Sequence, residues 1–297
     1  MRHTHFSFKI YAVIVLAVAS IMVHSTQIHA VAPKSETAQD AKNSALIKGL
    51  APHKALYKVS MIESKSGTQL VNVSGNMLYE WHPSCEGWVS NHRFNLTYEY
   101  ADSPAHEVVS DFSNFERFDG SHLNFTSQRK KQGAVYEEIR GHAEKTVQSG
   151  AGSAVYKLPK GLVFDLPPST FFPVGHTLEV LKAAQDGKRF FSATIFDGSD
   201  EEGPVEVNAF IGREKPIDQD LLKGKDKSID STLIAETAHR VRLAFFPLIE
   251  GSAEPEYEMS LLFQKNGIIT NMVVEYDDFS VRQELIALNP LSGQCGE

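Results

Sequence analysis

Two cysteines and a scattered set of histidines are the residues of this chain with the clearest capacity for chemistry. Cys85 and Cys295 stand far apart and form no Cys-x-x-Cys pair, which argues against redox catalysis. His106-Glu107 does not complete a His-Glu-x-x-His zinc motif, because Ser110 stands where the second histidine belongs. After residue 32 the histidines stand at positions 53, 82, 92, 106, 122, 142, 176 and 239, with no i, i+2 or i, i+4 pair. The pattern predicts no metal site.

Catalytic and cofactor motifs are also missing from the sequence. Gly150-Ala151-Gly152-Ser153 lacks the last glycine of a Gly-x-Ser-x-Gly nucleophile elbow. The acidic stretch from Asp197 to Glu202 lacks the oxygen-ligand ladder of an EF-hand. We therefore predict no catalytic residue and no cofactor. A hydrolase with dispersed residues is the rival hypothesis, and it needs a serine or a perturbed carboxylate beside a histidine in a cleft.

The N-terminus has the features of an export signal. Arg2 and Lys9 precede an almost unbroken apolar run of 14 residues, Ile10 to Val23, which is shorter than the 20 or so residues of a spanning helix. Ala30-Val31-Ala32 fits a signal-peptidase site. The sequence thus predicts a signal peptide over residues 1–32, a periplasmic location, and a mature protein that does not span the membrane.

The remaining 265 residues have the size of one large domain or two small ones. Residues 33–48 are small and polar, and we predict a disordered spacer there, followed by a single domain over residues 49–297. The whole chain carries a net charge of −8, and the signal peptide contributes two basic residues and no acidic ones. The acidic mature chain disfavours a nucleic-acid partner, because phosphate binding requires a basic surface.

The even number of cysteines permits one disulfide in an oxidising compartment. A Cys85–Cys295 bridge would tie the C-terminal tail to the body of the domain. Two free thiols are the alternative.

Beyond the spacer, the dominant pattern is a period of two. Apolar residues alternate with polar ones over 71–82, 94–100, 205–211, 240–245 and 257–276, which indicates strands with one buried and one solvated face. Asn266-Gly267 and Asp197-Gly198 are turn dipeptides between such runs, and we predict hairpin turns there. About a dozen strands follow from this pattern.

One segment has helical spacing instead. Val174, Leu178 and Leu181 fall on one helical face, and Pro173 and Gly187 suit the first turn and the position after the last. We predict a helix of about 12–14 residues from Pro173 to Asp186, packed on the concave face of the sheet. Ile217 to Glu236 is charged and weakly patterned, and we predict a loop with one short helix. Sheet twist accumulates over many strands, so the fold class is mainly β: a strongly curved antiparallel sheet, that is, a β-spiral or broken barrel.

Several short motifs, taken in order, resemble the EipB family of periplasmic cell-envelope integrity proteins of alphaproteobacteria. They begin with Leu50-Ala-Pro-His53, Gly75 to Tyr79 and Cys85-Glu86-Gly87. Phe196 to Asp200 follows the helix, and Asn266-Gly267-Ile268, Tyr276 to Ser280 and the near-terminal Cys295 complete the set. The likeness covers residue 50 to the end.

The resemblance implies a spiral sheet with a helix against it, the Cys85–Cys295 disulfide, and a role in envelope integrity with no known enzymatic activity. We therefore predict a non-enzymatic protein that binds an envelope protein, a peptide or a lipid on its curved sheet. The plan is also similar to that of lipoprotein carriers of the LolA and LolB type, which makes a lipid or lipoprotein carrier an alternative.

Overall fold

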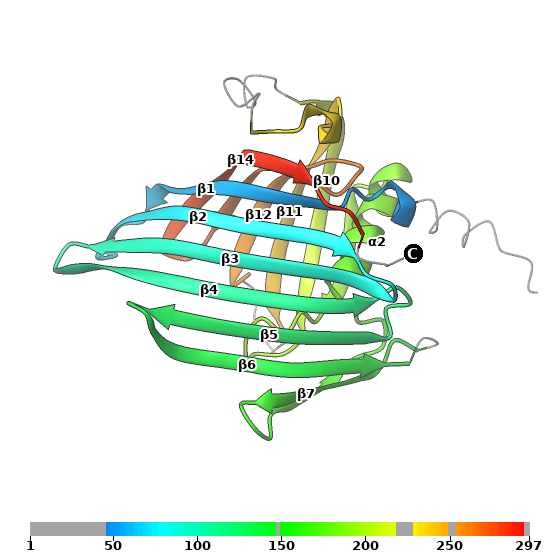
Figure 1. Cartoon of the computed structure of the whole chain (residues 1–297), viewed down its shortest axis with the longest axis horizontal. Helices are drawn as coiled ribbons and strands as arrows, with labels where there is room; N and C mark the ends of the chain where they lie inside the picture. The colour runs from blue at the N-terminus through cyan, green and yellow to red at the C-terminus, as the bar shows by residue number, and fades with distance from the viewer. Residues whose placement is uncertain (1–45, 147–148, 218–227, 249–253, 294–297) are drawn as a thin grey trace, which may run out of the picture. The chain divides into compact units, whose positions relative to one another are not determined.

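A single curved antiparallel sheet dominates the computed structural model, which describes residues 46–146, 149–217, 228–248 and 254–293 (Figure 1). The strands are β1 (His53–Ser64), β2 (Leu70–Pro83), β3 (Gly87–Tyr100), β4 (Ser103–Arg117), β5 (His122–Lys131), β6 (Ala134–Lys145), β7 (Gly152–Leu158), β8 (Val163–Leu166), β9 (Phe190–Ile195), β10 (Val205–Pro216), β11 (Thr237–Pro247), β12 (Tyr257–Phe263), β13 (Ile269–Glu275) and β14 (Phe279–Pro290).

The strand order is β8-β7-β6-β5-β4-β3-β2-β1-β14-β13-β12-β11-β10-β9. Strands that follow one another in the chain therefore pair, with the exception of β8 and β9, and the one additional pairing joins β1 to β14, where His53 is opposite Pro290. Strands β8 and β9 are the two ends of this order, so the sheet curls round without closing. The predicted fold class, a strongly curved antiparallel sheet with a helix against it, is confirmed.

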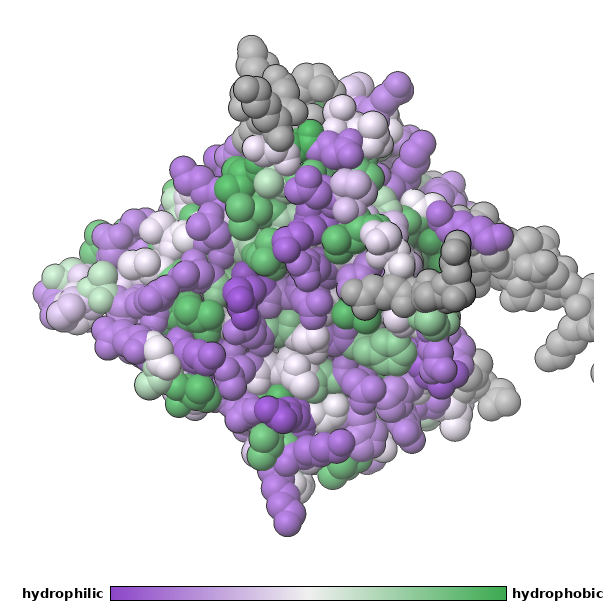
Figure 2. All heavy atoms as spheres, viewed as in Figure 1, coloured by the Kyte–Doolittle hydropathy of each residue, from purple (hydrophilic) through white to green (hydrophobic). Residues whose placement is uncertain are grey.

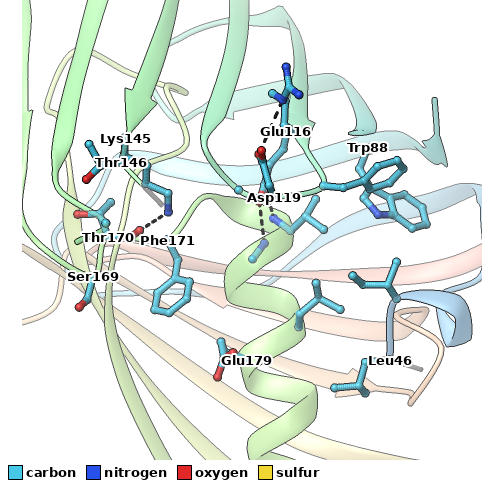
Figure 3. Close-up of a pocket in the computed structure, with 18 of the residues that line it drawn as sticks. Leu46, Trp88, Glu116, Asp119, Lys145, Thr146, Ser169, Thr170, Phe171 and Glu179 are labelled. Carbon is cyan, nitrogen blue, oxygen red and sulfur yellow. Dashed lines mark hydrogen bonds and ion pairs between the residues drawn. The ribbon is translucent and has the colours of Figure 1, made fainter. Parts of the chain in front are cut away.

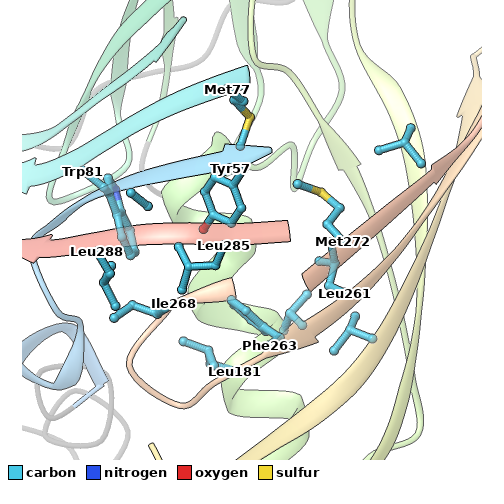
Figure 4. Close-up of a cluster of buried hydrophobic side chains, with 14 of the residues drawn as sticks. Tyr57, Met77, Trp81, Leu181, Leu261, Phe263, Ile268, Met272, Leu285 and Leu288 are labelled. Carbon is cyan, nitrogen blue, oxygen red and sulfur yellow. The ribbon is translucent and has the colours of Figure 1, made fainter. Parts of the chain in front are cut away.

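The core lies on the inner face of the sheet, where alternate residues of each strand point. Val207, Ala209 and Ile211 of β10 are buried, whereas their neighbours Glu206 and Phe210 are exposed. The largest cluster of buried side chains, which we call the main cluster, joins β1–β3 and β10–β14 to the helix (Figure 4). Its members in the figure include Tyr57, Met77, Trp81, Leu181, Leu261, Phe263, Ile268, Met272, Leu285 and Leu288.

Helix α2 (Pro173–Gln185) agrees with the helix predicted from the sequence. Pro173 occupies the first turn. At the other end Gly187 has a φ of +70°, and the N–H groups of Gly187 and Lys188 bond the carbonyls of Ala184 and Ala183. This is a Schellman motif, and glycine is favoured at Gly187 because that residue of the motif has a left-handed conformation. Val180 and Leu181 of α2 belong to the main cluster, so the side of the helix that carries them is buried against the sheet.

A second group of buried side chains, which we call the seam cluster, lies where the two ends of the sheet approach one another. It consists of Leu123, Phe125, Ile139, Ala143, Ala154, Tyr156, Leu166, Phe172 and Phe196. These residues come from β5–β8, from the start of α2 and from the segment after β9. The gap in the backbone pairing is therefore filled by side chains.

Strands β4–β8 gave the weakest sequence signal. The structure has fourteen strands in its sheet, against about a dozen predicted. The inner positions of β4 include Asn114 and Glu116, and Arg129 of β5 pairs with Glu137 of β6. Polar residues on the inner positions weaken the alternation that marks a strand.

One further segment differs from the prediction and another agrees with it in the part that the structure describes. Residues 46–49 are helical and Leu46 is buried, so regular structure begins inside the predicted spacer. The predicted loop of Ile217 to Glu236 contains the 3-10 helix η2 (Ser231–Leu233), and its residues 218–227 lie outside the described part of the chain.

Candidate functional site

A cavity of about 460 Å³ lies beside the N-terminal end of α2 (Figure 3). Its walls come from the start of β3, the ends of β4 and β6, the first two turns of α2, and the helical residues 46–47. The volume falls in the range of small-molecule binding pockets. Figure 3 shows polar and apolar side chains meeting there.

Glu116, near the end of β4, fixes α2 to the sheet. Its two carboxylate oxygens accept hydrogen bonds from the backbone N–H groups of Val174 (2.6 Å) and Gly175 (2.9 Å). The residue before the helix, Phe172, offers no side-chain cap. The Glu116 carboxylate, which comes from a strand, thus caps the helix in place of the Ser, Thr or Asp that usually precedes a helix. Its negative charge is also favourable at the positive end of the helix dipole.

The Glu116 carboxylate is unusual because it is only 3% exposed. Burial raises its pKa to about 7, although the two backbone N–H groups and the nearby Lys145 charge act in the opposite direction. Desolvation therefore outweighs the favourable contacts. Glu116 is a carboxyl group whose charge changes near neutral pH.

Lys145, at the end of β6, places a positive charge in the wall of the cavity. Its ammonium group donates a hydrogen bond to the carbonyl of Thr170 and lies 4.4 Å from the centre of the Phe172 ring. Burial lowers the pKa of Lys145, and the Glu116 charge partly offsets that effect. Lys145 therefore holds the segment before α2 by a hydrogen bond and a cation–π contact.

Trp88 supplies a hydrogen-bond donor that is unused. The side chain is only 4% exposed and packs against Trp81 with ring centres 4.7 Å apart and the ring planes tilted by 33°. Its indole nitrogen has no hydrogen-bond partner in the described structure. Buried Trp N–H groups usually have a partner, because leaving one unpaired costs free energy. Since Trp88 lines the cavity, a bound molecule could supply the missing acceptor.

Apolar side chains form part of the wall. Leu46, Phe118, Phe171 and Leu178 line the cavity, and Phe118 is 43% exposed at its edge. The remaining lining is polar or charged, and it includes Arg117, Asp119, Thr170 and Glu179. The cavity thus combines an apolar portion with many polar groups.

The residues that the sequence singled out lie elsewhere. Cys85 is exposed between β2 and β3, while Cys295 lies outside the described residues. Asn266 and Gly267 lie between β12 and β13, where Gly267 has a φ of +86° and the Asn266 side-chain oxygen accepts from the Ile268 N–H at 3.2 Å. The Asn266 amide also donates to the Leu233 carbonyl at 2.8 Å.

Asp197 and Gly198 lie in a long connection between β9 and β10, at the seam. The Asp197 carboxylate accepts from the Ser199 N–H at 2.8 Å, and Gly198 has a φ of +72°. A Cβ atom at Gly198 would lie 2.3 Å from the Phe125 ring, so only glycine fits. These two residues shape the seam, and the structure brings neither the turn residues nor Cys85 into the cavity.

Sequence reasoning missed Trp88, Glu116 and Lys145, three of the polar residues that line the cavity. The sequence did contain a hint for Glu116. It follows Phe112 and Asn114 at intervals of two along β4, and alternate residues of a strand point to the same face, here the inner one. No local pattern links it to the start of α2, which is 58 positions away in the chain.

Among the residues that the structure describes, no helix is long and apolar enough to cross a membrane. Within the same residues, no three histidine, cysteine, aspartate or glutamate side chains gather as a metal site would require.

Comparisons with known proteins agree with one another. A family model described as EipB-like matches residues 44–292. The cell envelope integrity protein EipB of Brucella abortus (strain 2308) is 27% identical over 243 residues, which cover 81% of this chain and 84% of that protein. A crystal structure from Brucella abortus, titled a beta-barrel-like protein of domain of unknown function DUF1849, has a TM-score of 0.74 and 26% identity, and the match covers 82% of this chain and 99% of that one.

Proposed function

Because the chain belongs to the EipB-like family, we propose that it supports the integrity of the cell envelope as a non-enzymatic binding protein of the periplasm. The similar protein of Brucella abortus is named for envelope integrity. The periplasmic location rests on the signal peptide predicted over residues 1–32, which lie outside the described part of the chain.

The unpaired indole N–H of Trp88 is the observation that carries a binding function. A molecule in the cavity would accept this hydrogen bond and cover Leu46, Phe171 and Leu178. An acyl lipid meets both needs, since its ester carbonyl is an acceptor and its chain is apolar. An extended peptide is the alternative occupant, and a lipid-modified protein, as in a LolA- or LolB-type carrier, is a third.

Intrinsic fluorescence tests this proposal directly. The chain has only two tryptophans, and Trp81 packs against Trp88, which lines the cavity. Titrating delipidated protein with a lysophospholipid whose acyl chain is brominated should quench the emission at stoichiometric ratio, because bromine quenches at contact. Native mass spectrometry of protein from a periplasmic fraction should show the matching adduct.

A matched pair of variants separates the hydrogen bond from general packing. Trp88→Phe removes the donor and keeps a ring, so lysophospholipid affinity should fall by roughly three- to tenfold, the worth of one hydrogen bond. Trp81→Phe is the control and should bind normally. An empty protein that no lysophospholipid quenches would contradict lipid binding, and a peptide adduct would favour the alternative occupant.

The hydrolase hypothesis has less support. Glu116 is a carboxyl group with a raised pKa in a cleft, as that hypothesis requires. However, both of its oxygens are engaged by α2, and the described residues that line the cavity include no histidine. Glu116 is better explained as the cap of the helix.

We also propose the Cys85–Cys295 disulfide as the staple of the C-terminal tail. Gly293, the last described residue, lies against Pro83: a Cβ atom on Gly293 would be 3.3 Å from the Pro83 ring. Cys85 and Cys295 each lie two residues beyond this contact, and two residues span about 7 Å. The contact therefore leaves the sulfur atoms within reach of each other.

Reduction should lower the melting temperature of the wild-type protein, because the bridge restricts the unfolded chain. The chain-entropy model gives up to about 5 kcal/mol for a loop of this length. A Cys85→Ser, Cys295→Ser double variant should melt at the lower temperature with or without reductant. An identical melting temperature for oxidised and reduced wild type would contradict the bridge.

A further inference from the structure

A second hollow lies on the outer face of the sheet, opposite the face that carries α2. It is a shallow groove of about 490 Å³ across β2–β6. Figure 2 shows mainly hydrophilic residues on this side of the molecule, over the strands that face the viewer in Figure 1. The groove shares no lining residue with the α2 cavity.

Ten of the lining residues point outward and form two complete rows across the five strands. Their register shows which residues lie side by side. One row is Leu78, Arg93, Asp111, Gln128 and Glu138, and the next is Glu80, Asn91, Ser113, Thr126 and Arg140. With strands 4.7–4.9 Å apart, each row is about 19 Å long, and the rows are about 7 Å apart. The site therefore fits a narrow linear molecule that runs across the strands.

Contacts within the rows hold many of these side chains in place. Arg93 is paired with Asp111, and Arg140 is paired with Glu138 at 2.6 Å. The Ser113 hydroxyl donates to the Asn91 side-chain oxygen at 2.6 Å. Most members of the rows are only half-exposed. An ordered polar surface loses little side-chain entropy when it binds a ligand.

Among the described residues, the polar side-chain groups of the two rows that make no contact within the protein include both hydrogen-bond donors and acceptors. The Asn91 amide nitrogen, the Thr126 hydroxyl and the Gln128 amide have no hydrogen bond in the described structure. Two arginines face three carboxylates, and the carboxylate of Glu80 is paired with Lys54 at 2.7 Å, so positive and negative charges nearly cancel. Such a surface suits hydroxyl groups, which both donate and accept, and it does not favour a polyanion.

From this geometry we propose that the outer groove binds a linear, uncharged oligosaccharide. The sugar hydroxyls would form hydrogen bonds with the free amide and hydroxyl groups of Gln128, Thr126 and Asn91. The fixed ion pairs would form the sides of the site. This second site is independent of the function proposed for the α2 cavity, because the two lie on opposite faces of the sheet.

Calorimetric titration of the whole mature protein with chitotetraose, maltotetraose and cellotetraose tests the proposal. At least one should bind with a dissociation constant of millimolar or tighter. A Thr126→Val, Gln128→Ala double variant should weaken that binding by roughly tenfold, the worth of one to two hydrogen bonds. Asn124→Ala is the control, since Asn124 is exposed on the outer face of the same strand but outside the groove.

The outcomes are distinct. Binding that the double variant loses and the Asn124→Ala control keeps supports the site, provided that both variants melt like the wild type. No binding of any of the three sugars, or binding that the double variant leaves unchanged, overturns it. Preferential binding of heparin would also overturn it, because a polyanion is a different class of ligand. Lysophospholipid quenching of the tryptophans reports on the other cavity and is unaffected by either result.

Discussion

The sheet is joined to itself in two places, and the two joints are built differently. At the first, β1 and β14 pair from His53 opposite Pro290 to Ser64 opposite Phe279. At the second, the seam, β8 and β9 do not pair, and one isolated bridge from Phe171 to Ile195 stands near the seam cluster. A continuous ladder of backbone hydrogen bonds makes the first joint, whereas the second, among the described residues, has only the backbone bonds of Phe171 and depends mainly on side chains. The seam is therefore the place where a change of side chain should open the sheet.

The largest effect is expected from emptying the seam cluster. Phe125 is 1% exposed, and its ring lies 5.0 Å from that of Tyr156 and 5.5 Å from that of Phe196. Phe125→Ala should lower the free energy of unfolding by about 3–5 kcal/mol, through lost burial and a cavity. Urea denaturation measures the change. Phe210→Ala, on the outer face at 54% exposure, is the control and should cost less than about 1 kcal/mol. Equal losses of unfolding free energy in the two variants would show that the stability of the protein does not depend on the seam cluster.

Proline substitutions contrast the two joints at the level of the backbone. Lys58 lies in β1 between β2 and β14, so proline there removes a ladder hydrogen bond and should cost about 3 kcal/mol or more. Ser192 lies in the edge strand β9. The neighbouring contacts of Thr194 and Phe196 with Phe171 show that its N–H points away from β10. Ser192→Pro should therefore cost about 1 kcal/mol or less. A lower melting temperature for Ser192→Pro than for Lys58→Pro would show that the backbone of β9 contributes more to stability than the β1 ladder does.

A smaller, pH-dependent effect is expected where α2 leaves the seam. The pKa of Glu116 is raised from 4.5 to about 7, so the folded protein holds this proton more tightly than the unfolded chain does. Stability from Glu116 is fully present below pH 4.5 and is lost as the pH rises through about 7. The wild type should lose about 3 kcal/mol more than Glu116→Gln between pH 4.5 and 8.

The comparison with Glu116→Gln is needed because other groups titrate in the opposite sense. Burial lowers the pKa of His92 and of His176 to about 4, so their stability is lost as the pH falls from 6.5 towards 4. Both histidines remain in the variant, and their contribution cancels in the difference. Parallel stability–pH curves for the two proteins would rule out the shift at Glu116.

Local patterns predicted the elements that have a clean apolar face. Helix α2 and the strands β10–β13 were evident because Val207, Ala209 and Ile211, for example, alternate with polar neighbours. The main cluster follows from the same alternation. Strands β4–β6 were indistinct because their inner face carries Asn114, Glu116 and Arg129.

The site was hidden for a different reason. Glu116, Lys145 and Trp88 act through partners that are distant in the chain, and only the curling of the sheet brings them to the start of α2. The outer groove depends on strand register, since Arg93, Asp111 and Gln128 are neighbours only when the two hairpins β3–β4 and β4–β5 have paired in one alignment. Spacing along a sequence does not specify such contacts.

The pairing of β1 with β14 has a consequence for how the chain reaches its native state. Each hairpin of the sheet can form as soon as its two strands are available, whereas β1 lacks its second neighbour until the last strand of the domain arrives. Contacts between the two ends of a chain are slow to form, and an unpaired strand edge is open to other chains in the meantime. Folding should therefore finish only after the whole domain is available, and truncation before β14 should leave one edge of β1 unpaired and prone to aggregation.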